Sequence, residues 1–497
     1  MDDHTTPQQQ RSEFRTRLAA WTDRLFLLME QRYPDKDALL HTLQRSIPPV
    51  LASMIIGLVS VLYAKFFLMS EHFSRQFFDT HPLLFVLISP VFFLFSWAIV
   101  RFAAPFARGS GIPQVLGALE VSGTGSDERL DRLLGFRVAV AKVASSLTLA
   151  LGGGAIGREG PTIQIAASIA RGFRTMLPES WPKASERTMI ITGSAAGLAA
   201  AFNTPLGGIV FAIEELSRSH FTAVRTTLLT SVIVAGLVAQ MLMGPYLYLG
   251  YPWVPSLTLP LLTASIITAI AAGVLGTVFS VGAQKLLEIR NRRSGWWPQA
   301  LFTIICSLTM SGFALWLSPV VFGSGKEMMV GLLFGQSSAS PGIDVAGRFI
   351  GPLASFTSGG AGGIFAPSFS IGAALGKWAS VIAGFTPDQG NMVVLAGMAA
   401  FLTAVTRSPF TSSILVLEMT DRHAMVFVLM VASLISYLVS WSLDRHSLYE
   451  HLKTSYLREA GTGPAPTEGT DASVAAGGTL PASPRGTPPL PHGTPPA

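Results

Sequence analysis

Residues 152–161 read Gly-Gly-Gly-Ala-Ile-Gly-Arg-Glu-Gly-Pro, at the end of an apolar run that covers residues 138–156. Glycine and proline interrupt helices, and an interrupted helix at membrane depth persists only where protein or a water-filled cavity satisfies its backbone polar groups. A charged side chain there costs ~2.5–3.5 kcal/mol, so Glu159 is expected to have a function. Its neighbour Arg158 is a poor ion-pair partner, because adjacent residues point in different directions. The stretch therefore predicts a broken membrane helix that presents Glu159 to a polar site.

Apolar runs long enough to cross a hydrocarbon layer of ~30 Å surround this stretch. They cover residues 47–69, 82–104, 138–156, 189–213, 226–244, 258–284, 300–322 and 424–443. The chain of 497 residues is 49% hydrophobic and 13% charged, with a mean hydropathy of +0.47, whereas soluble domains carry about 25% charged residues. One or two such runs could be buried core helices, but eight could not. We predict an all-α polytopic membrane protein.

The pattern around this stretch recurs about 200 residues later in the chain. The recurring positions are Pro161, Pro205 and Glu214 in the first half and Pro367, Pro409 and Glu418 in the second. The two prolines are 44 residues apart in the first half and 42 in the second, and the glutamate follows nine residues after the second proline in both. Internal repeats interrupted by glycine and proline are common in transporters, where they form the substrate site near the bilayer midplane. We expect two structurally similar halves.

Three interrupted segments between apolar runs are the candidates for a binding site: residues 108–113, 152–161 and 359–367. A helix that begins within the membrane aims unpaired N–H groups and a positive dipole end at whatever lies ahead, which suits an anion. Ser110 adds a hydroxyl donor, although it could also be only a helix N-cap, just as Gly362-Gly363 could be only a packing notch. An ionised Glu159 facing such a site would occupy it as a tethered anion, and a protonated one can swing away. Glu159 can therefore act as a gate and carry a proton.

Several other charged or aromatic residues admit a functional and a structural interpretation. Glu214 and Glu215 follow the apolar run 209–213 and are either solvated charges at a helix end or functional acids. Tyr449 comes just after the last apolar run, where an interfacial aromatic anchor is the ordinary expectation. We interpret three further residues as structural or field-shaping: Arg158, Lys142 and Glu418.

The two ends of the chain differ from the middle. Residues 1–45 are predicted to form an amphipathic helix along the inner membrane face, from apolar residues spaced three and four apart: Phe14, Leu18, Trp21, Leu25 and Leu28. Because this segment is polar, we expect no cleavable signal peptide. Residues 457–497 are dominated by Gly, Pro, Ala, Thr and Ser, which predicts a disordered tail. The single cysteine, Cys306, excludes a disulfide framework and a cysteine-based metal site.

The net charge of +6, from 35 basic and 29 acidic residues, lies largely in segments between the apolar runs, which we interpret as cytoplasmic loops. No basic stripe lies on a soluble domain, so nucleic acid is not an expected partner.

Taken in order, three motifs and a late tyrosine resemble the CLC family of chloride channels and chloride/proton exchangers. The motifs are Gly109-Ser110-Gly111-Ile112-Pro113, Gly157-Arg158-Glu159-Gly160-Pro161 and Gly362-Gly363-Ile364-Phe365-Ala366-Pro367, followed by Tyr449. The resemblance covers roughly residues 45–455 and implies a transmembrane domain at residues 46–456. It also implies two antiparallel, inverted-topology repeats of tilted and broken helices, at about residues 46–245 and 258–450, and a homodimer with one pore per subunit.

By matching motifs, the resemblance implies roles for individual residues. Ser110, the backbone N–H groups of Ile364 and Phe365, and Tyr449 would hold the central chloride, with Glu159 as the external gate. Glu215, the second acid of a Glu-Glu pair, matches the internal proton-transfer glutamate of the family's exchangers. The supporting residues are Gly109, Gly111, Pro113, Gly157, Arg158, Gly160, Pro161 and Gly363. Gln114 departs from the family pattern, where a glutamate often follows the proline, and is expected to alter local hydrogen bonding.

The resemblance therefore implies a secondary active transporter that exchanges chloride for protons, with a passive voltage- or pH-gated chloride channel on the same scaffold as the alternative. We expect no enzyme, because neither a nucleophile elbow nor a zinc motif such as His-Glu-x-x-His occurs, and we expect no cofactor and no metal. About 40 residues follow the last helix, too few for the family's cytoplasmic regulatory domains. A short, signal-free chain predicts a protein of a bacterial inner membrane, in contact with lipid and with both termini cytoplasmic.

Overall fold

The computed structural model describes residues 36–461, apart from 124–126, 179–180, 182, 218–220, 245–246, 293–294 and 336–339. Most of the predicted N-terminal helix over residues 1–45, and the predicted tail beyond residue 461, lie outside the described residues. The described residues form helices joined by short loops, which confirms the predicted all-α class. The α-helices are α2 (Lys36–Thr80), α3 (Pro82–Ala98), α4 (Ile112–Val121), α5 (Asp127–Leu134), α6 (Phe136–Leu151), α7 (Glu159–Met176), α8 (Glu186–Phe202), α9 (Pro205–Phe211), α10 (Phe221–Met243), α11 (Leu259–Arg292), α12 (Trp296–Trp316), α13 (Lys326–Leu333), α14 (Pro341–Thr357), α15 (Phe365–Ile382), α16 (Pro387–Thr406), α17 (Pro409–Thr420), α18 (Val426–Leu443) and α19 (Leu448–Glu459).

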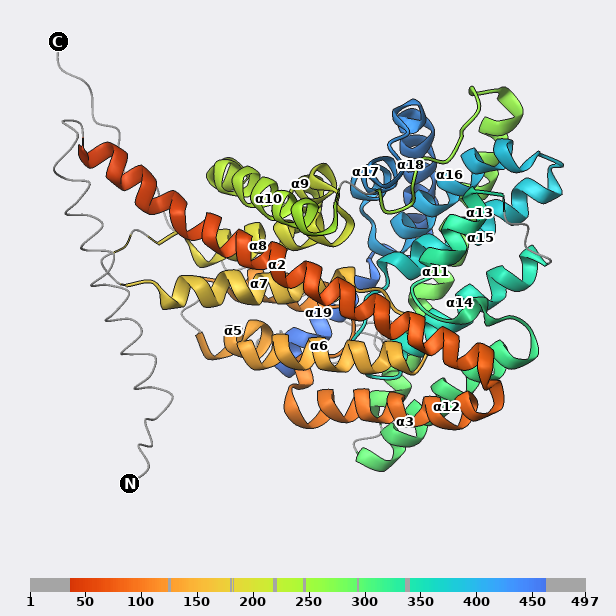
Figure 1. The fold of residues 1–497 in the computed structure, drawn as a ribbon, viewed down its shortest axis with the longest axis horizontal. Helices are drawn as coiled ribbons and strands as arrows, with labels where there is room; N and C mark the ends of the chain where they lie inside the picture. The colour runs from red at the N-terminus through yellow and green to blue at the C-terminus, as the bar shows by residue number, and fades with distance from the viewer. Residues whose placement is uncertain are drawn as a thin grey trace, which may run out of the picture.

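Eight stretches of the described chain are helical, long and apolar enough to cross a membrane. They cover residues 47–80, 82–103, 127–151, 226–243, 259–292, 296–316, 387–406 and 423–443. The helix α2 runs obliquely across the whole bundle, and α3 packs against α12 at one edge (Figure 1). Most of these spans coincide with the apolar runs of the sequence.

The predicted run 189–213 is wrong as a single membrane-spanning helix. The helix α8 ends at Phe202, Asn203 adopts a left-handed φ of 57°, and α9 begins at Pro205, so the run is broken. Conversely, α16 is a candidate span that the apolar runs missed. It opens with Pro-Asp-Gln-Gly at residues 387–390, which leaves an apolar stretch too short to stand out, and 94% of its most apolar window is buried inside the protein.

The repeat in the sequence is also a repeat in the structure. The helices α7, α8 and α9 correspond to α15, α16 and α17, and the break at Asn203 corresponds to a break at Arg407, with positive φ angles of 57° and 65°. The equivalent glycines Gly157 and Gly363 form an antiparallel bridge, in which the N–H of each donates to the carbonyl of the other at 2.7 Å. A reciprocal contact of this kind is what two halves of opposite direction produce where they meet.

Glu214 and Glu418, which are also equivalent in the repeat, each cap a helix of the other half. Glu214 accepts hydrogen bonds from two backbone N–H groups in the first turn of α17, at 3.1 and 2.7 Å. Glu418 accepts from two backbone N–H groups in the first turn of α9, at 3.0 and 2.6 Å. Each carboxylate satisfies otherwise unpaired donors and meets the positive end of a helix dipole. Glu214 is therefore not a solvated charge, and Glu418 has the structural role assigned to it.

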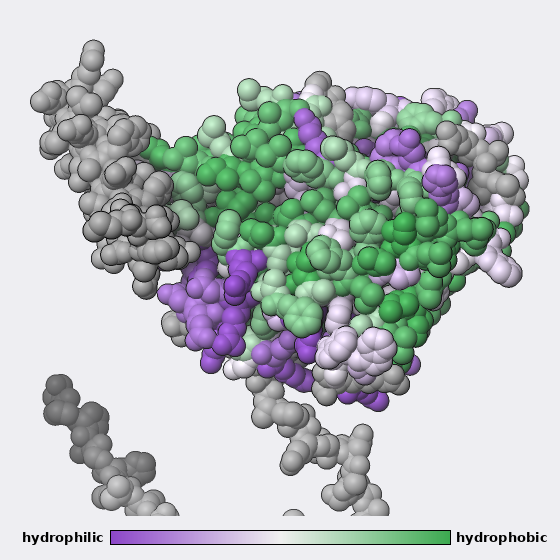
Figure 2. Space-filling view, turned by 60° about the horizontal axis from the view of Figure 1, so that its bottom comes forward, coloured by the Kyte–Doolittle hydropathy of each residue, from purple (hydrophilic) through white to green (hydrophobic). Residues whose placement is uncertain are grey.

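The outer surface of the bundle carries many large apolar side chains. Leu87, Phe136, Met241 and Phe427 are each between 71% and 85% exposed. Figure 2 shows one face on which apolar residues form a broad continuous surface, with hydrophilic residues gathered near its ends. Soluble proteins rarely expose apolar patches of this size, so this surface is suited to lipid chains.

The described ends extend beyond the predicted boundaries. Residues 36–45 of the predicted N-terminal segment belong to α2 and continue directly into the first span. At the other end, α19 runs to Glu459, past residue 456, because Leu457 is buried and Glu459 forms an ion pair with Arg108.

Candidate functional site

The three glycine-rich segments singled out in the sequence meet at one place. The N–H of Gly109 donates to the carbonyl of Gly360 at 2.9 Å, and the N–H of Gly362 donates to the carbonyl of Gly109 at 3.0 Å. Gly157 and Gly363 add the reciprocal pair described above. The backbone groups that the broken helices leave free are thus satisfied by one another. The junction joins two segments of the first half to one of the second.

Two glycines at the junction are needed for close approach. A Cβ at residue 160 would lie 2.3 Å from Ser110 Oγ, and one at residue 363 would lie 3.0 Å from both the carbonyl oxygen of Gly157 and the N atom of Gly160. Gly111 has a φ of 107°, which side-chain-bearing residues rarely adopt. The supporting glycines of the motifs are therefore explained by packing and backbone conformation.

Three helices begin at this junction: α4 at Ile112, α7 at Glu159 and α15 at Phe365. Their N-cap residues, Gly111, Arg158 and Ile364, provide no side-chain hydrogen bond to the helix start. Pro113 and Pro161 lie in the first turns of α4 and α7, where a proline lacks an N–H that has no intrahelical partner anyway. Helix starts without side-chain caps keep backbone donors and a positive dipole end available, which is the arrangement that binds anions.

The residues predicted to hold chloride lie together in the interior. Ser110 Oγ lies 3.5 Å from Tyr449 Oη, and the ring of Tyr449 lies 6.2 Å from that of Phe365, centroid to centroid. Ser110, Tyr449, Ile364 and Phe365 are all 1–2% exposed. Tyr449 is in the first turn of α19, so it is a buried residue of the site and not an interfacial anchor. Four helix starts, those of α4, α7, α15 and α19, therefore supply the centre.

Glu159 is completely buried at the first position of α7. Its carboxylate packs against Gly157. A Cβ added at residue 157 would lie 2.3 Å from Glu159 Oε2 and 3.4 Å from the Cβ of Ala366. The carboxylate has no hydrogen-bonded side-chain partner among the described residues. Arg158 is also buried and directs a guanidinium N–H to the carbonyl of Ala201, at 3.4 Å. Glu159 is thus buried next to the junction without a hydrogen-bonded side-chain partner in the described part of the chain.

The comparisons with known proteins agree with this geometry. The family model for voltage gated chloride channels matches residues 91–441 of the chain. The chain belongs to the CLC family. The predicted resemblance is confirmed, and with the eight apolar spans it establishes an integral membrane protein.

Solved CLC structures share the fold over most of their length. A slow cyanobacterial Cl⁻/H⁺ antiporter is 26% identical, with a TM-score of 0.72 over 84% of this chain and 98% of the other. A CLC-type fluoride/proton antiporter is 21% identical, with a TM-score of 0.67 over 81% and 96%. A eukaryotic CLC transporter is 23% identical, with a TM-score of 0.66 over 83% and 74%. The fold is therefore that of CLC transporters.

Glu215 has other contacts than its neighbour Glu214, which caps α17. Its carboxylate accepts a hydrogen bond from Ser408 Oγ at 2.9 Å, and the residue is 5% exposed. Burial raises the pKa of the Tyr449 hydroxyl, and the charges of Glu215 and Glu159 add to this rise.

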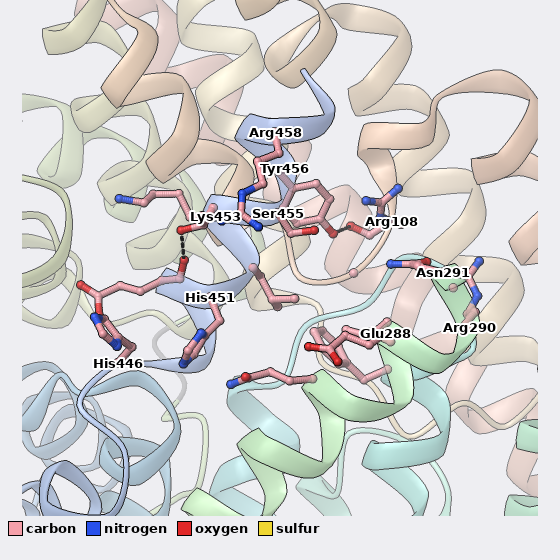
Figure 3. A pocket seen from close by; sticks show the side chains of 18 residues that line it. Arg108, Glu288, Arg290, Asn291, His446, His451, Lys453, Ser455, Tyr456 and Arg458 are labelled. Atoms are coloured by element: carbon pink, nitrogen blue, oxygen red, sulfur yellow. Dashed lines mark hydrogen bonds between the residues drawn. The ribbon is translucent and has the colours of Figure 1, made fainter. Parts of the chain in front are cut away.

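A cavity of about 610 Å³ is lined in part by Gly109 and Glu450, which are the sequence neighbours of Ser110 and Tyr449. Gly109 and Tyr456 are part of its wall, and Arg108 stacks on the Tyr456 ring at 4.7 Å (Figure 3). Burial raises the pKa of Tyr456, so its hydroxyl stays neutral beside the guanidinium. Four Arg or Lys residues and two Glu residues line this cavity, which we call the basic cavity: Arg108, Arg290, Lys453, Arg458, Glu288 and Glu450. Arg108 and Lys453 are paired with Glu459 and Glu120.

Lys142 and Gln114 hold the loop that carries Ser110. The ammonium of Lys142, which is fully buried, donates to the carbonyl of Gly109 at 2.9 Å. Gln114 donates to the carbonyls of Arg108 and Phe106, at 2.7 and 3.1 Å. The departure from the family pattern at Gln114 therefore places a neutral donor, and no carboxylate, beside this loop.

Two charged residues near a second cavity were missed in the sequence. Arg348 is fully buried in α14 and donates to Ser370 Oγ at 2.8 Å and to carbonyls of residues 320–323. Glu71 of α2 accepts from the N–H of Ser324 and lines a cavity of about 420 Å³ together with Lys326. Both lie within apolar helices, and that placement is the signal that could have found them.

Proposed function

We propose that this CLC protein exchanges chloride for protons across a membrane. The observation that carries the proposal is the junction itself, where helix starts without side-chain caps converge beside a buried carboxylate that has no side-chain partner. The first part of that arrangement binds an anion, and the second competes with it. The chloride/proton antiport named for the cyanobacterial relative supports the same assignment.

The central chloride would be held by the hydroxyls of Ser110 and Tyr449 and by the backbone N–H groups of Ile364 and Phe365. All four are buried around the starts of α4, α15 and α19. Lys142 lies behind Ser110 and adds a positive charge without occupying the site. Anion binding here needs no fixed cation in direct contact, which keeps binding weak enough for release.

Glu159 would serve as the gate and the outer proton carrier. When it is ionised, its carboxylate competes with chloride for the positive helix ends; when it is protonated, that attraction is lost and the side chain can move away. Glu215 would receive the proton on the inner side, because it is buried and accepts a hydrogen bond from the neutral hydroxyl of Ser408. Protons and chloride would then share the outer part of the route and separate at Tyr449.

The orientation in the membrane follows from the basic cavity. The positive-inside rule places the side that carries Arg108, Arg290 and Lys453 in the cytoplasm. On this assignment Tyr449 faces inwards, Glu159 faces outwards and the two termini are cytoplasmic. We further propose a homodimer with one pore per subunit in a bacterial inner membrane, in line with the family.

Reconstituted vesicles test the exchange directly. An outward chloride gradient, without a pH gradient, is expected to drive proton uptake, and the reversal potential is expected to depend on both gradients. A reversal potential that follows chloride alone would contradict exchange and establish a passive chloride channel. The same preparation with Glu159→Ala provides the matched control for proton leakage.

A further inference from the structure

Three potential metal ligands meet at the junction of α18 and α19, outside the transport site. One ligand atom each from Asp444, His446 and His451 lies within 4.8 Å of the other two. His451 Nε2 is 3.4 Å from Asp444 Oδ2, and the two imidazole rings are 5.4 Å apart, centroid to centroid. Figure 3 shows both histidines at one side of the basic cavity, whose wall they help to form.

The backbone around these residues is held in place by hydrogen bonds. Asp444 Oδ1 accepts from the N–H of His446 at 3.0 Å, and Arg407 donates to the carbonyl of Asp444 at 3.2 Å. Ser447 and Glu450 form a capping box that fixes the start of α19. His451 Nε2 is itself buried and makes no aligned hydrogen bond within the described part of the chain. The α18–α19 turn is thus stabilised mainly by backbone and capping hydrogen bonds, while Asp444 Oδ2 and the imidazoles of His446 and His451 contact one another.

We propose that Asp444, His446 and His451 bind a divalent transition-metal cation of the Zn²⁺ class, which clamps the α18–α19 junction. Two imidazoles and a carboxylate, with a fourth position open to water, form a donor set that Zn²⁺ accepts. Tetrahedral coordination at ~2.0–2.2 Å needs ligand atoms about 3.5 Å apart, so small side-chain rotations close the site.

The clamp has a consequence for transport because Tyr449 lies between two of the ligands in sequence. His446 lies just before α19, and His451 lies in the first turn of α19, which also carries Tyr449. A metal bound to both histidines would therefore hold this turn in place. Tyr449 in turn lies 3.5 Å from Ser110. A bound cation is therefore expected to slow chloride passage. This consequence rests on the proposed function, whereas the binding itself does not.

Zn²⁺ titration of the purified full chain, stripped with a chelator and read with a competing zinc indicator, tests the site. One Zn²⁺ per chain is expected, and His446→Ala, His451→Ala or Asp444→Asn is expected to weaken binding by at least about tenfold, the lower end of the effect of groups that only orient ligands. His423→Ala is the matched control, since His423 pairs with Asp421 at an exposed position. Unchanged binding in the ligand variants, or an equal loss in the control, overturns the site.

Chloride efflux from vesicles tests the clamp separately. Zn²⁺ on the Tyr449 side is expected to slow efflux by the wild-type chain and to leave His451→Ala unaffected. Stoichiometric binding with no slowing of efflux overturns the clamp. A chain that binds Zn²⁺ through these ligands but moves no chloride would contradict the proposed function and leave the metal site standing.

Discussion

Replacing Gly160 by alanine would place a methyl carbon 2.3 Å from Ser110 Oγ and 2.8 Å from the Ser110 carbonyl oxygen. Ordinary van der Waals contact begins at 3.4 Å, so the Ser110 hydroxyl would have to shift by about 1 Å. The carbonyl is part of the backbone and cannot rotate away alone. We therefore expect Gly160→Ala to displace the loop that carries Ser110 and to destabilise the fold by ~1–3 kcal/mol, the usual cost of overpacking.

The displacement also removes one hydrogen bond to the proposed chloride. A hydrogen bond to a charged group contributes ~1.5–3 kcal/mol, so chloride affinity is expected to fall roughly ten- to hundredfold. Titration calorimetry of chloride into the chloride-free protein in detergent measures this loss. Ser110→Ala, which removes the hydroxyl without overpacking, is expected to weaken binding in the same direction.

Gly172→Ala is the matched control on the same helix. A Cβ at residue 172 has no atom within 4 Å, and Ala favours a helix over Gly by ~1 kcal/mol. We expect unchanged chloride affinity and equal or higher stability. If Gly160→Ala elutes as a folded protein and binds chloride as tightly as Gly172→Ala does, the reasoning about Ser110 is refuted.

Three further predictions follow from the acids. Glu159→Ala is expected to keep chloride flux and to abolish chloride-driven proton uptake in vesicles, because the proton carrier is removed while the anion site stays open. Persistent proton uptake would contradict the role of Glu159 as proton carrier. Glu215→Gln is expected to keep chloride flux and to block proton entry from the inner side, and an unchanged exchange ratio would move the role to another acid. Glu214→Ala and Glu418→Ala are each expected to lower the free energy of unfolding by ~1–3 kcal/mol, because each removes a charged helix cap. The thermal midpoint in detergent is expected to fall below that of the control Glu288→Ala, which changes an exposed residue.

The centre of the protein could be predicted because its determinants are local. Glycine and proline break helices wherever they stand, so the positions of the three interrupted segments could be derived from the sequence. The resemblance then supplied Ser110, Ile364, Phe365 and Tyr449, and the structure places all four in one buried cluster. Their roles as chloride ligands stay predictions.

The parts that sequence reasoning missed depend on tertiary contacts or on signals weaker than hydropathy. Asn203 breaks a run that hydropathy alone treats as continuous, although an Asn-Thr-Pro sequence is a turn signal. The cap that Glu214 provides involves a helix about 200 residues away in the chain, which no local pattern shows. The rule that flagged Glu159 applies also to Glu71 and Arg348, but Glu71 lies just past the apolar run 47–69 and Arg348 in a helix that no apolar run covers, so a search along the runs alone does not reach them.

The metal ligands illustrate a further limit. Asp444 caps the end of α18, His446 lies in the linker and His451 in α19, so only the turn between the two helices brings them together. Their spacing matches no common zinc motif, which is why the sequence alone predicted no metal.

The repeat separates structural acids from those proposed to move protons. Glu214 is equivalent to Glu418, and both have the same task of capping a helix of the other half. Glu159 is equivalent to Phe365, and Glu215 to Met419, so neither has an acidic counterpart. A perfectly symmetric junction would present the same chemistry to both sides of the membrane, and an exchanger needs an outer and an inner proton site that differ. Glu159 and Glu215, which have no acidic counterpart in the other half, therefore fit the two different proton sites that an exchanger needs.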